Sequence, residues 1–323
     1  MKSTIFLKFI FVLALVLSLC DAKSISKYIK DLKDYKKDVE NYLKVKNIER
    51  DIEYNESRTL DVYYNKDEVD EENLKPVIIH IYGGTWKKGN KVKFTKIGSF
   101  LEENDYVAVL PNYGLFPFAV FEDMVYDVYT AINWTFENIK KYGGDPKRIT
   151  ITSHSAGAHL TALTLFKSYN YMENNGVTLK PLPAIEKIVF LAGPFDFDDY
   201  KIIKKEYAEA DEDETINNSL VEKFVKVLFR TRTVSPHDVV RDMNDNSVDD
   251  SFNVKKFVFY YTSKDEKVPE ASAKKLMNQM KRVCPNVDIE YVYKEGYAHS
   301  DIVNGVRWDI QEQKDIYLSL IRN

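Results

Sequence analysis

The clearest pattern along the chain is an alternation of short apolar runs with longer stretches of helical periodicity. The runs are rich in β-branched and aromatic residues, which is typical of strands buried on both faces of a parallel sheet. They lie at residues 76–82, 106–110, 149–152, 185–192, 255–261 and 287–293. The helical stretches lie at residues 119–142, 155–166, 271–283 and 308–321. This alternation predicts an α/β fold with a mostly parallel, twisted sheet and helices on both faces.

The chain before the sheet has a different character. Residues 23–50 are highly charged and place apolar residues at spacings of three and four, which predicts an amphipathic helical extension packed on the main domain. A helix lying on a membrane surface is the alternative, but its polar face mixes Asp and Glu with Lys, which disfavours anionic lipid. Residues 51–64 are expected to supply the first strands of a domain that spans residues 51–323.

Residues 197–248 interrupt the alternation of strands and helices. This segment, called the insertion below, is charged and mostly helical in pattern, and Ser235-Pro236 provides a stop signal within it. Because it falls between two strands of the sheet, we expect it to form a helical lid over the strand ends.

Residues 1–22 have the parts of a secretory signal peptide: two lysines, an apolar run at residues 9–19 and a plausible cleavage site of small residues. The run is short for a membrane span. Cleavage would direct the protein to the secretory pathway, either secreted or in the lumen of the endoplasmic reticulum. An uncleaved signal anchor is the alternative, and it would be the one route to membrane association.

Composition narrows the choice of partners and cofactors. The 323 residues suffice for one large core, and the formal net charge of −4, with acids and bases interspersed, gives no sign of nucleic-acid binding. No stretch has metal-ligand spacing, so neither a metal nor another cofactor is expected. After cleavage Cys284 would be the remaining cysteine, which excludes an internal disulfide. Sequons at Asn55, Asn133 and Asn217 allow for a glycoprotein, although Asn133 lies in a helix expected to face the core.

The candidate chemistry centres on the junction between the apolar run at residues 149–152 and the helix that follows it. Residues 153–157, Ser-His-Ser-Ala-Gly, have the small-x-Ser-x-Gly spacing of a nucleophile elbow. Small residues are needed because the strand and helix backbones pass close together at this turn. The turn would hold the Ser155 hydroxyl at a helix N-terminus, where backbone N–H groups favour developing negative charge. The five residues alone also fit an ordinary strand-to-helix turn, so the interpretation depends on the rest of the chain.

An acid and a histidine follow two later strands of the expected sheet. In an open parallel sheet, reactive groups collect at the carboxyl ends of the strands, which brings Ser155, Asp265 and His299 to one edge. The chain order Ser, Asp, His is that of α/β-hydrolases and differs from the chymotrypsin and subtilisin orders. His299 would remove the serine proton and Asp265 would fix the imidazole tautomer. Asp196 and Asp301 are the alternatives for the acid.

A glycine pair follows an earlier strand. Gly83 and Gly84 have no side chains, so their backbone N–H groups can point into a pocket and, with the N–H of Ala156, form an oxyanion hole. A plain turn is the simpler explanation for two glycines alone. The remaining histidines are expected to pack against the sheet or, for the last, to lie in the insertion: His80, His154, His159 and His237.

These residues resemble the α/β-hydrolase family, in the branch that holds prenylcysteine methylesterases, kynurenine formamidases and related carboxylesterases. The resemblance covers roughly residue 60 to the C-terminus and depends on five pieces: His80-Ile-Tyr-Gly-Gly-Thr-Trp-Lys-Lys-Gly89, Tyr142-Gly-Gly-Asp-Pro-Lys-Arg-Ile149, Ser153-His-Ser-Ala-Gly-Ala-His-Leu160, Asp265-Glu-Lys-Val-Pro269 and Ala298-His299.

The resemblance implies an α/β-hydrolase fold and a serine hydrolase that cleaves carboxylic esters of small molecules through an acyl-enzyme. Tyr82 stands before the glycine pair, where formamidases tend to carry His. Two alternatives stay open. One is hydrolysis of an aryl formamide with the same residues, and the other is a hydrolase fold that binds without catalysis.

Overall fold

The computed structural model describes residues 22–197 and 234–322. Its centre is a sheet with the strand order β1-β2-β4-β3-β5-β8-β9-β10. The strands are β1 (Ile48–Asn55), β2 (Arg58–Tyr63), β3 (Lys75–Ile81), β4 (Val107–Pro111), β5 (Gly144–His154), β8 (Ile185–Leu191), β9 (Val254–Lys264) and β10 (Ile289–Ala298). From β4 to β10 all neighbours pair in parallel, whereas β1 and β2 form an antiparallel edge. The mostly parallel sheet agrees with the prediction.

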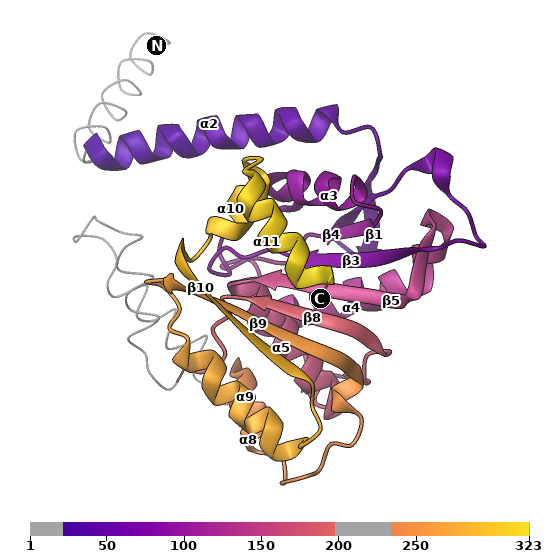
Figure 1. The fold of residues 1–323 in the computed structure, drawn as a ribbon, viewed down its shortest axis with the longest axis vertical. Helices are drawn as coiled ribbons and strands as arrows, with labels where there is room; N and C mark the ends of the chain where they lie inside the picture. The colour runs from indigo at the N-terminus through magenta and orange to yellow at the C-terminus, as the bar shows by residue number, and fades with distance from the viewer. Residues whose placement is uncertain (1–21, 198–233, 323) are drawn as a thin grey trace, which may run out of the picture.

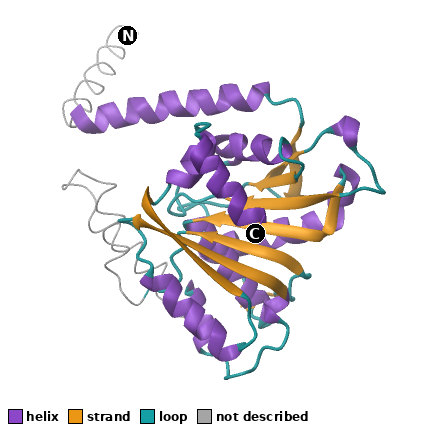
Figure 2. Cartoon of the chain, viewed as in Figure 1, coloured by secondary structure: helices purple, strands orange, loops and turns teal. Residues whose placement is uncertain are grey.

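The helices that cover the sheet lie in two layers, one on each face (Figure 1). They are α3 (Thr95–Glu102), α4 (Phe121–Asn138), α5 (Ala156–Tyr169), α8 (Pro236–Arg241), α9 (Ala271–Val283), α10 (Asp301–Arg307) and α11 (Gln311–Arg322). Helices α3, α10 and α11 pack together on one side, and α4, α5, α8 and α9 pack in succession on the other. Figure 2 shows the strands enclosed between these layers. Double coverage explains the apolar runs in β3, β4 and β8.

Several short elements connect the main ones. They are the 3₁₀ turns η1 (Lys66–Glu68), η2 (Lys91–Phe94), η3 (Ile139–Tyr142) and η5 (Ser251–Asn253), and a hairpin of β6 (Glu173–Asn174) and β7 (Val177–Thr178). Helix α4 and η3 end at Gly143, whose φ of 76° closes the turn as the Gly-Gly-Asp-Pro sequence predicts.

The N-terminal extension is shorter than predicted. Helix α2 (Ala22–Lys44) ends six residues before residue 50, because Ile48 already begins β1. Asp38 pairs with Arg307 of α10 in a buried ion pair with an Nε–Oδ1 distance of 2.9 Å, which docks the helix on the domain. Leu32 and Leu43 on another side of α2 are more than half exposed.

The remaining helices and the ends of the described segments differ from the predictions in several places. The predicted final helix, residues 308–321, corresponds to α11, which begins three residues later, after Asp309 with a φ of 63°. Helix α10, just before it, was not predicted. Helix α3 was not predicted. The signal segment lies outside the described residues except Ala22, and so does the insertion between residues 198 and 233, with the sequon at Asn217. Among the helices that the structure describes, none has the length and apolar character needed to span a bilayer.

Candidate active site

Ser155 stands at the sharp turn between β5 and α5. Its backbone has φ 51° and ψ −120°, a conformation that residues with a Cβ rarely adopt. The turn is held by a hydrogen bond from the Ser155 N–H to the carbonyl of Leu191 on the neighbouring strand, at 2.9 Å. The hydroxyl is therefore presented at the carboxyl edge of the sheet and at the first turn of a helix, as the elbow motif predicts.

The small residues around Ser155 are explained by close backbone approach. A Cβ on Gly157 would lie 2.3 Å from the carbonyl oxygen of Ile81 and 2.4 Å from that of Tyr82. Helix α5 thus crosses β3 at a distance that excludes a side chain. Ser153 occupies the other small position, fully buried, and its hydroxyl reaches the Val189 carbonyl at 3.4 Å. A serine is accommodated there because its Oγ has a neighbouring acceptor.

The structure brings Ser155, His299 and Asp265 into one hydrogen-bonded chain. Nε2 of His299 lies 2.8 Å from Oγ of Ser155, and Nδ1 lies 2.8 Å from Oδ2 of Asp265. A carboxylate only accepts hydrogen bonds, so Nδ1 carries the proton and Nε2 presents its lone pair to the serine hydroxyl. This arrangement can withdraw a proton from Oγ as the oxygen attacks a carbonyl carbon.

Asp265 is fixed by its own loop. Its Oδ1 accepts hydrogen bonds from the backbone N–H groups of Lys267 and Val268, each at 2.9 Å, which leaves Oδ2 for the histidine. The two alternative acids are engaged elsewhere. Asp196 forms an ion pair with Lys275, and Asp301 accepts a hydrogen bond from the N–H of Ala298 at 2.7 Å.

The residues predicted for the oxyanion hole border the serine. A Cβ on Gly83 would lie 2.9 Å from Cβ of Ser155, and Gly84 has a φ of 147° that favours glycine. Ala156 is the first residue of α5. In the described part of the chain, the N–H groups of these three residues donate no hydrogen bond. They are the kind of donors that a developing oxyanion requires.

The remaining histidines are more specifically engaged than the sequence indicated. His80 contacts Thr152 at 3.0 Å and Tyr317 at 3.1 Å through Nδ1. His154 donates from Nε2 to the backbone carbonyl of His299, at 3.0 Å. Burial lowers the pKa of His80 to about 3 and holds the pKa of His154 well below its usual value, so both rings stay neutral.

His159 was expected only to pack against the sheet. It instead bridges Trp86, whose indole N–H lies 3.1 Å from Nδ1, and the carbonyl of Val234, 2.7 Å from Nε2. Burial lowers its pKa to about 4. His237 lies beside Asp238 and Asp196, at 3.3 and 3.9 Å, within the predicted insertion.

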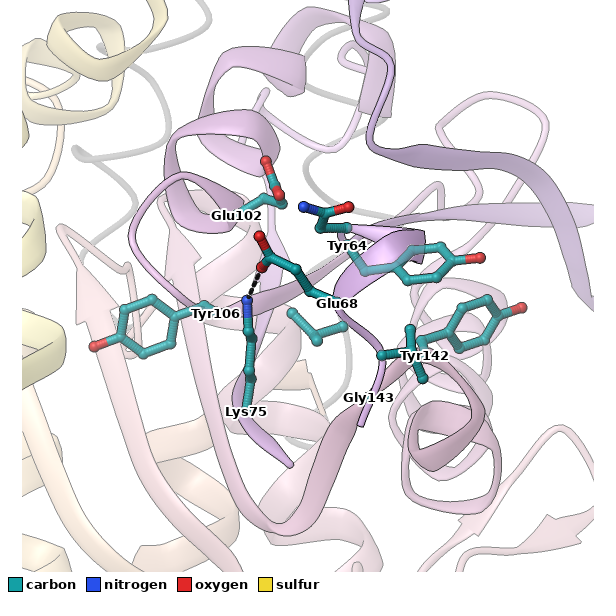
Figure 3. A pocket seen from close by; sticks show the side chains of 10 residues that line it. Tyr64, Glu68, Lys75, Glu102, Tyr106, Tyr142 and Gly143 are labelled. Carbon is teal, nitrogen blue, oxygen red and sulfur yellow. Dashed lines mark hydrogen bonds and ion pairs between the residues drawn. The ribbon is translucent and has the colours of Figure 1, made fainter. Parts of the chain in front are cut away.

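Within residues 22–197 and 234–322, one cavity lies at each of two opposite edges of the sheet. The one in Figure 3 is at the amino ends of β3 and β4, lined by residues such as Lys75 and Tyr106, and holds about 10 Å³, room for little more than one water molecule. An open cleft of about 310 Å³ lies at the carboxyl edge, beside Tyr82, Gly89 and Asn112. Of these two cavities, only the open cleft lies at the carboxyl ends of the strands, the edge of the sheet where Ser155 is found.

A match to a known protein family covers most of the sheet. The model of the BD-FAE family matches residues 60–280 of the chain. The chain belongs to the BD-FAE family. The matched range begins in β2, includes Ser155 and Asp265, and ends in α9, so it contains most of the sheet.

Curated relatives of this BD-FAE protein are named as esterases. The chain is 24% identical over 232 residues to a probable isoprenylcysteine α-carbonyl methylesterase, ICMEL2, of Arabidopsis thaliana, a match that covers 72% of this chain and 52% of the relative. It is 43% identical over 89 residues to the esterase LipQ of Mycobacterium tuberculosis, covering 27% and 21% of the two chains. The chain spans about half the length of the first of these relatives.

Solved structures confirm the fold. Esterase B from Lactobacillus rhamnosis, inhibited by a tributyrin phosphonate, superposes on this BD-FAE protein with a TM-score of 0.67, at 16% identity and covering 94% and 95% of the two chains. The esterase Est2 of Thermogutta terrifontis gives a TM-score of 0.59, at 17% identity and covering 85% and 93%. The α/β-hydrolase fold expected from the sequence is therefore correct.

Proposed function

We propose that this protein is a serine hydrolase that cleaves carboxylic esters of small molecules through an acyl-enzyme. The observation that carries the proposal is the continuous chain of hydrogen bonds from Ser155 through His299 to Asp265. Esterase names among the relatives support the same bond type.

The first half of the reaction acylates the enzyme. Oγ of Ser155 adds to the ester carbonyl carbon while its proton passes to Nε2 of His299, and the carbonyl electron pair moves onto oxygen. The N–H groups of Gly83, Gly84 and Ala156 stabilise that oxyanion. When the oxyanion collapses, the C–O bond to the alcohol breaks, and the leaving oxygen takes the proton from Nε2.

The second half releases the acid. Water adds to the acyl carbon and gives a proton to Nε2, and the tetrahedral species then expels Oγ, which recovers that proton. Asp265 stabilises the imidazolium of His299 in both halves without itself accepting the proton. The products are a carboxylic acid and an alcohol, and the enzyme returns to its starting state.

The proposal is tested with a fluorophosphonate probe and p-nitrophenyl acetate. We expect the purified protein to be labelled on Ser155 and to hydrolyse the ester, and Ser155→Ala to lose labelling together with about 10⁴-fold or more in kcat. Ser168→Ala, which changes a buried serine further along α5, is the matched control and should keep both. Unlabelled wild-type protein without turnover would leave only a binding role for the fold.

The bond type is tested separately. We expect short acyl esters to be turned over with a higher kcat/KM than N-formylkynurenine. The reverse preference would assign the same residues to formamide hydrolysis.

We further propose that residues 1–22 direct the protein to the secretory pathway as a cleavable signal. Expression of the full chain in eukaryotic cells, followed by N-terminal sequencing of the secreted protein, should find a new N-terminus near residue 23. A mature protein that still contains residues 1–22 and stays with membranes would favour the uncleaved anchor.

A further inference from the structure

We propose that His159 is a positioning residue for the oxyanion hole, and that it couples the oxyanion loop to the neck of the insertion. The oxyanion loop is residues 83–90, and the neck is residues 195–197 with residues 234–237. The proposal rests on the esterase function proposed above. The backbone N–H of His159 donates to the Ser155 carbonyl at 3.1 Å, as expected within one helical turn, but its imidazole acts through Trp86.

The oxyanion loop has an unusual backbone that requires an anchor. Gly84, Thr85 and Trp86 follow one another with φ values of 147°, 54° and 59°. Thr85 and Trp86 each carry a Cβ, so both hold a conformation that is unfavourable for them. Surrounding contacts must therefore hold the loop, or Gly83 and Gly84 would lose the orientation that the oxyanion needs.

The anchor is the Trp86 side chain, which is 2% exposed. Its indole meets His159 edge-on, with ring centroids 5.3 Å apart, and Phe121 in the same way at 5.5 Å. The carbonyl of Trp86 also accepts a hydrogen bond from the Phe116 N–H at 2.8 Å. Apolar packing alone would fill this space, yet the indole N–H needs an acceptor once it is buried, and Nδ1 of His159 provides it.

The hydrogen bonds determine the state of the imidazole. Indole N–H is only a donor, so Nδ1 of His159 must carry a lone pair, and Nε2 therefore carries the proton that it donates to the carbonyl of Val234. The ring is fully buried, and its pKa of about 4 is consistent with this neutral tautomer. One side chain thus satisfies a donor on the oxyanion loop and an acceptor on the residue that opens the second half of the neck.

The neck is itself tied together. The carbonyl of Phe195 accepts hydrogen bonds from the N–H of His237 at 2.9 Å and from the hydroxyl of Ser235 at 3.1 Å. Phe197, on the other side of the neck, packs its ring against His159 at 5.1 Å. His159 belongs to α5, the helix that begins directly after Ser155. The helix that follows the nucleophile, the oxyanion loop and the neck therefore meet at one buried imidazole.

The test compares substitutions that keep and that remove the bridge. His159→Leu removes both hydrogen bonds, and we expect kcat to fall by about 10- to 100-fold with little change in KM, since a misplaced oxyanion hole weakens transition-state binding. The rate of phosphonylation of Ser155 should fall by the same factor. His159→Gln retains an acceptor for the indole and a donor for the Val234 carbonyl, so we expect it to recover most of kcat.

A second route keeps the proposal testable if His159→Leu does not fold. Trp86→Phe removes the donor and leaves the histidine, and it should lower kcat to a similar extent, while His159→Leu added to it should cost little more. Thr164→Val, which removes a buried hydroxyl from the same helix, is the matched control and should lower stability without changing kcat.

All rates are expressed per active site titrated with the fluorophosphonate, so that loss of folded protein does not count as loss of kcat. Wild-type kcat in both His159→Leu and Trp86→Phe would overturn the positioning role and leave only a structural one. That outcome differs from failure of the proposed esterase function, in which the wild-type protein itself would be unlabelled and inactive.

Discussion

At the scale of single residues, the candidate active site depends on glycines at positions where a side chain would collide with the backbone. Gly157 lets α5 approach β3, and the approach sets where the Ser155 hydroxyl lies relative to the oxyanion loop. The motif spacing made Gly157 and Ser155 predictable, because the helix after such a serine must pass close to a neighbouring strand, and only glycine leaves room for that strand's carbonyl groups. Ser153 could be predicted to fit the first small position of the motif, since a serine side chain is only one hydroxyl larger than that of alanine.

Substituting Gly157 tests this steric account. Gly157→Ala should lower the free energy of unfolding by about 3 kcal/mol, because the new methyl group would overlap two backbone carbonyls that cannot move independently of the sheet. Urea unfolding followed by tryptophan fluorescence measures the change.

The control for Gly157→Ala is Gly176→Ala, in the hairpin of β6 and β7. Gly176 also has a positive φ, of 76°, but no atom lies within 4 Å of the added Cβ, so a loss of about 1 kcal/mol is expected. Equal losses at the two positions would contradict the steric explanation for Gly157.

The contacts of His159 show what the sequence could not reveal. Trp86 and His159 are 73 positions apart, and no spacing rule links them. His159 lies in an apolar helical stretch and Trp86 is itself a large apolar residue, so the simplest prediction for each is packing. Only the fold shows that the two side chains meet and that one supplies the acceptor that the other lacks.

At the scale of elements, the strands were predicted well and the ends of helices less well. Buried parallel strands have continuous apolar runs, which are visible in the sequence of β3, β4 and β8. The boundary between α10 and α11 depends on Asp309 adopting a left-handed conformation, and no glycine marks it. Helix α2 ends early because pairing with β2 extends the first strand back to Ile48.

The docking of α2 provides a prediction about stability. Asp38→Ala would leave the guanidinium of Arg307 buried without its partner, and we expect a loss of about 3–5 kcal/mol in the free energy of unfolding. Glu40→Ala on the same helix breaks an exposed pair with Lys36 at 4.0 Å and should cost no more than about 0.5 kcal/mol.

Asp38→Leu combined with Arg307→Leu removes both charges and should recover much of the loss. If Asp38→Ala were as mild as Glu40→Ala, the pair would not be what holds α2 on the domain.

At the scale of the whole molecule, the buried histidines predict how stability depends on pH. His80, His154 and His159 have pKa values well below 6.5 in the folded chain, two of them at about 3 and about 4, because burial disfavours the charged ring. The unfolded chain takes up these protons near pH 6.5, whereas the folded chain does not. Lowering the pH below 6.5 therefore favours unfolding, by up to about 1.4 kcal/mol per pH unit for each histidine.

Urea unfolding at pH 7, 6 and 5 measures this dependence. We expect the free energy of unfolding to change little above pH 7 on account of these groups and to fall steeply between pH 6 and pH 5. His80→Phe, which removes one of the three titrations, should make the fall shallower. A free energy of unfolding that rises as the pH is lowered from 7 to 5 would contradict the prediction.

The closed neck has a consequence for how proteins with this fold can diversify. Because Phe195, Ser235 and His237 are hydrogen-bonded to one another, the two ends of the neck stay together whatever the length of the chain between them. Doubling the length of a flexible connection between two fixed ends costs only about 0.6 kcal/mol of closure entropy. Mutation can therefore lengthen, shorten or rewrite that stretch while Ser155, Asp265 and His299 keep their places, so the proposed esterase could sample new substrates without rebuilding its hydrogen-bonded chain.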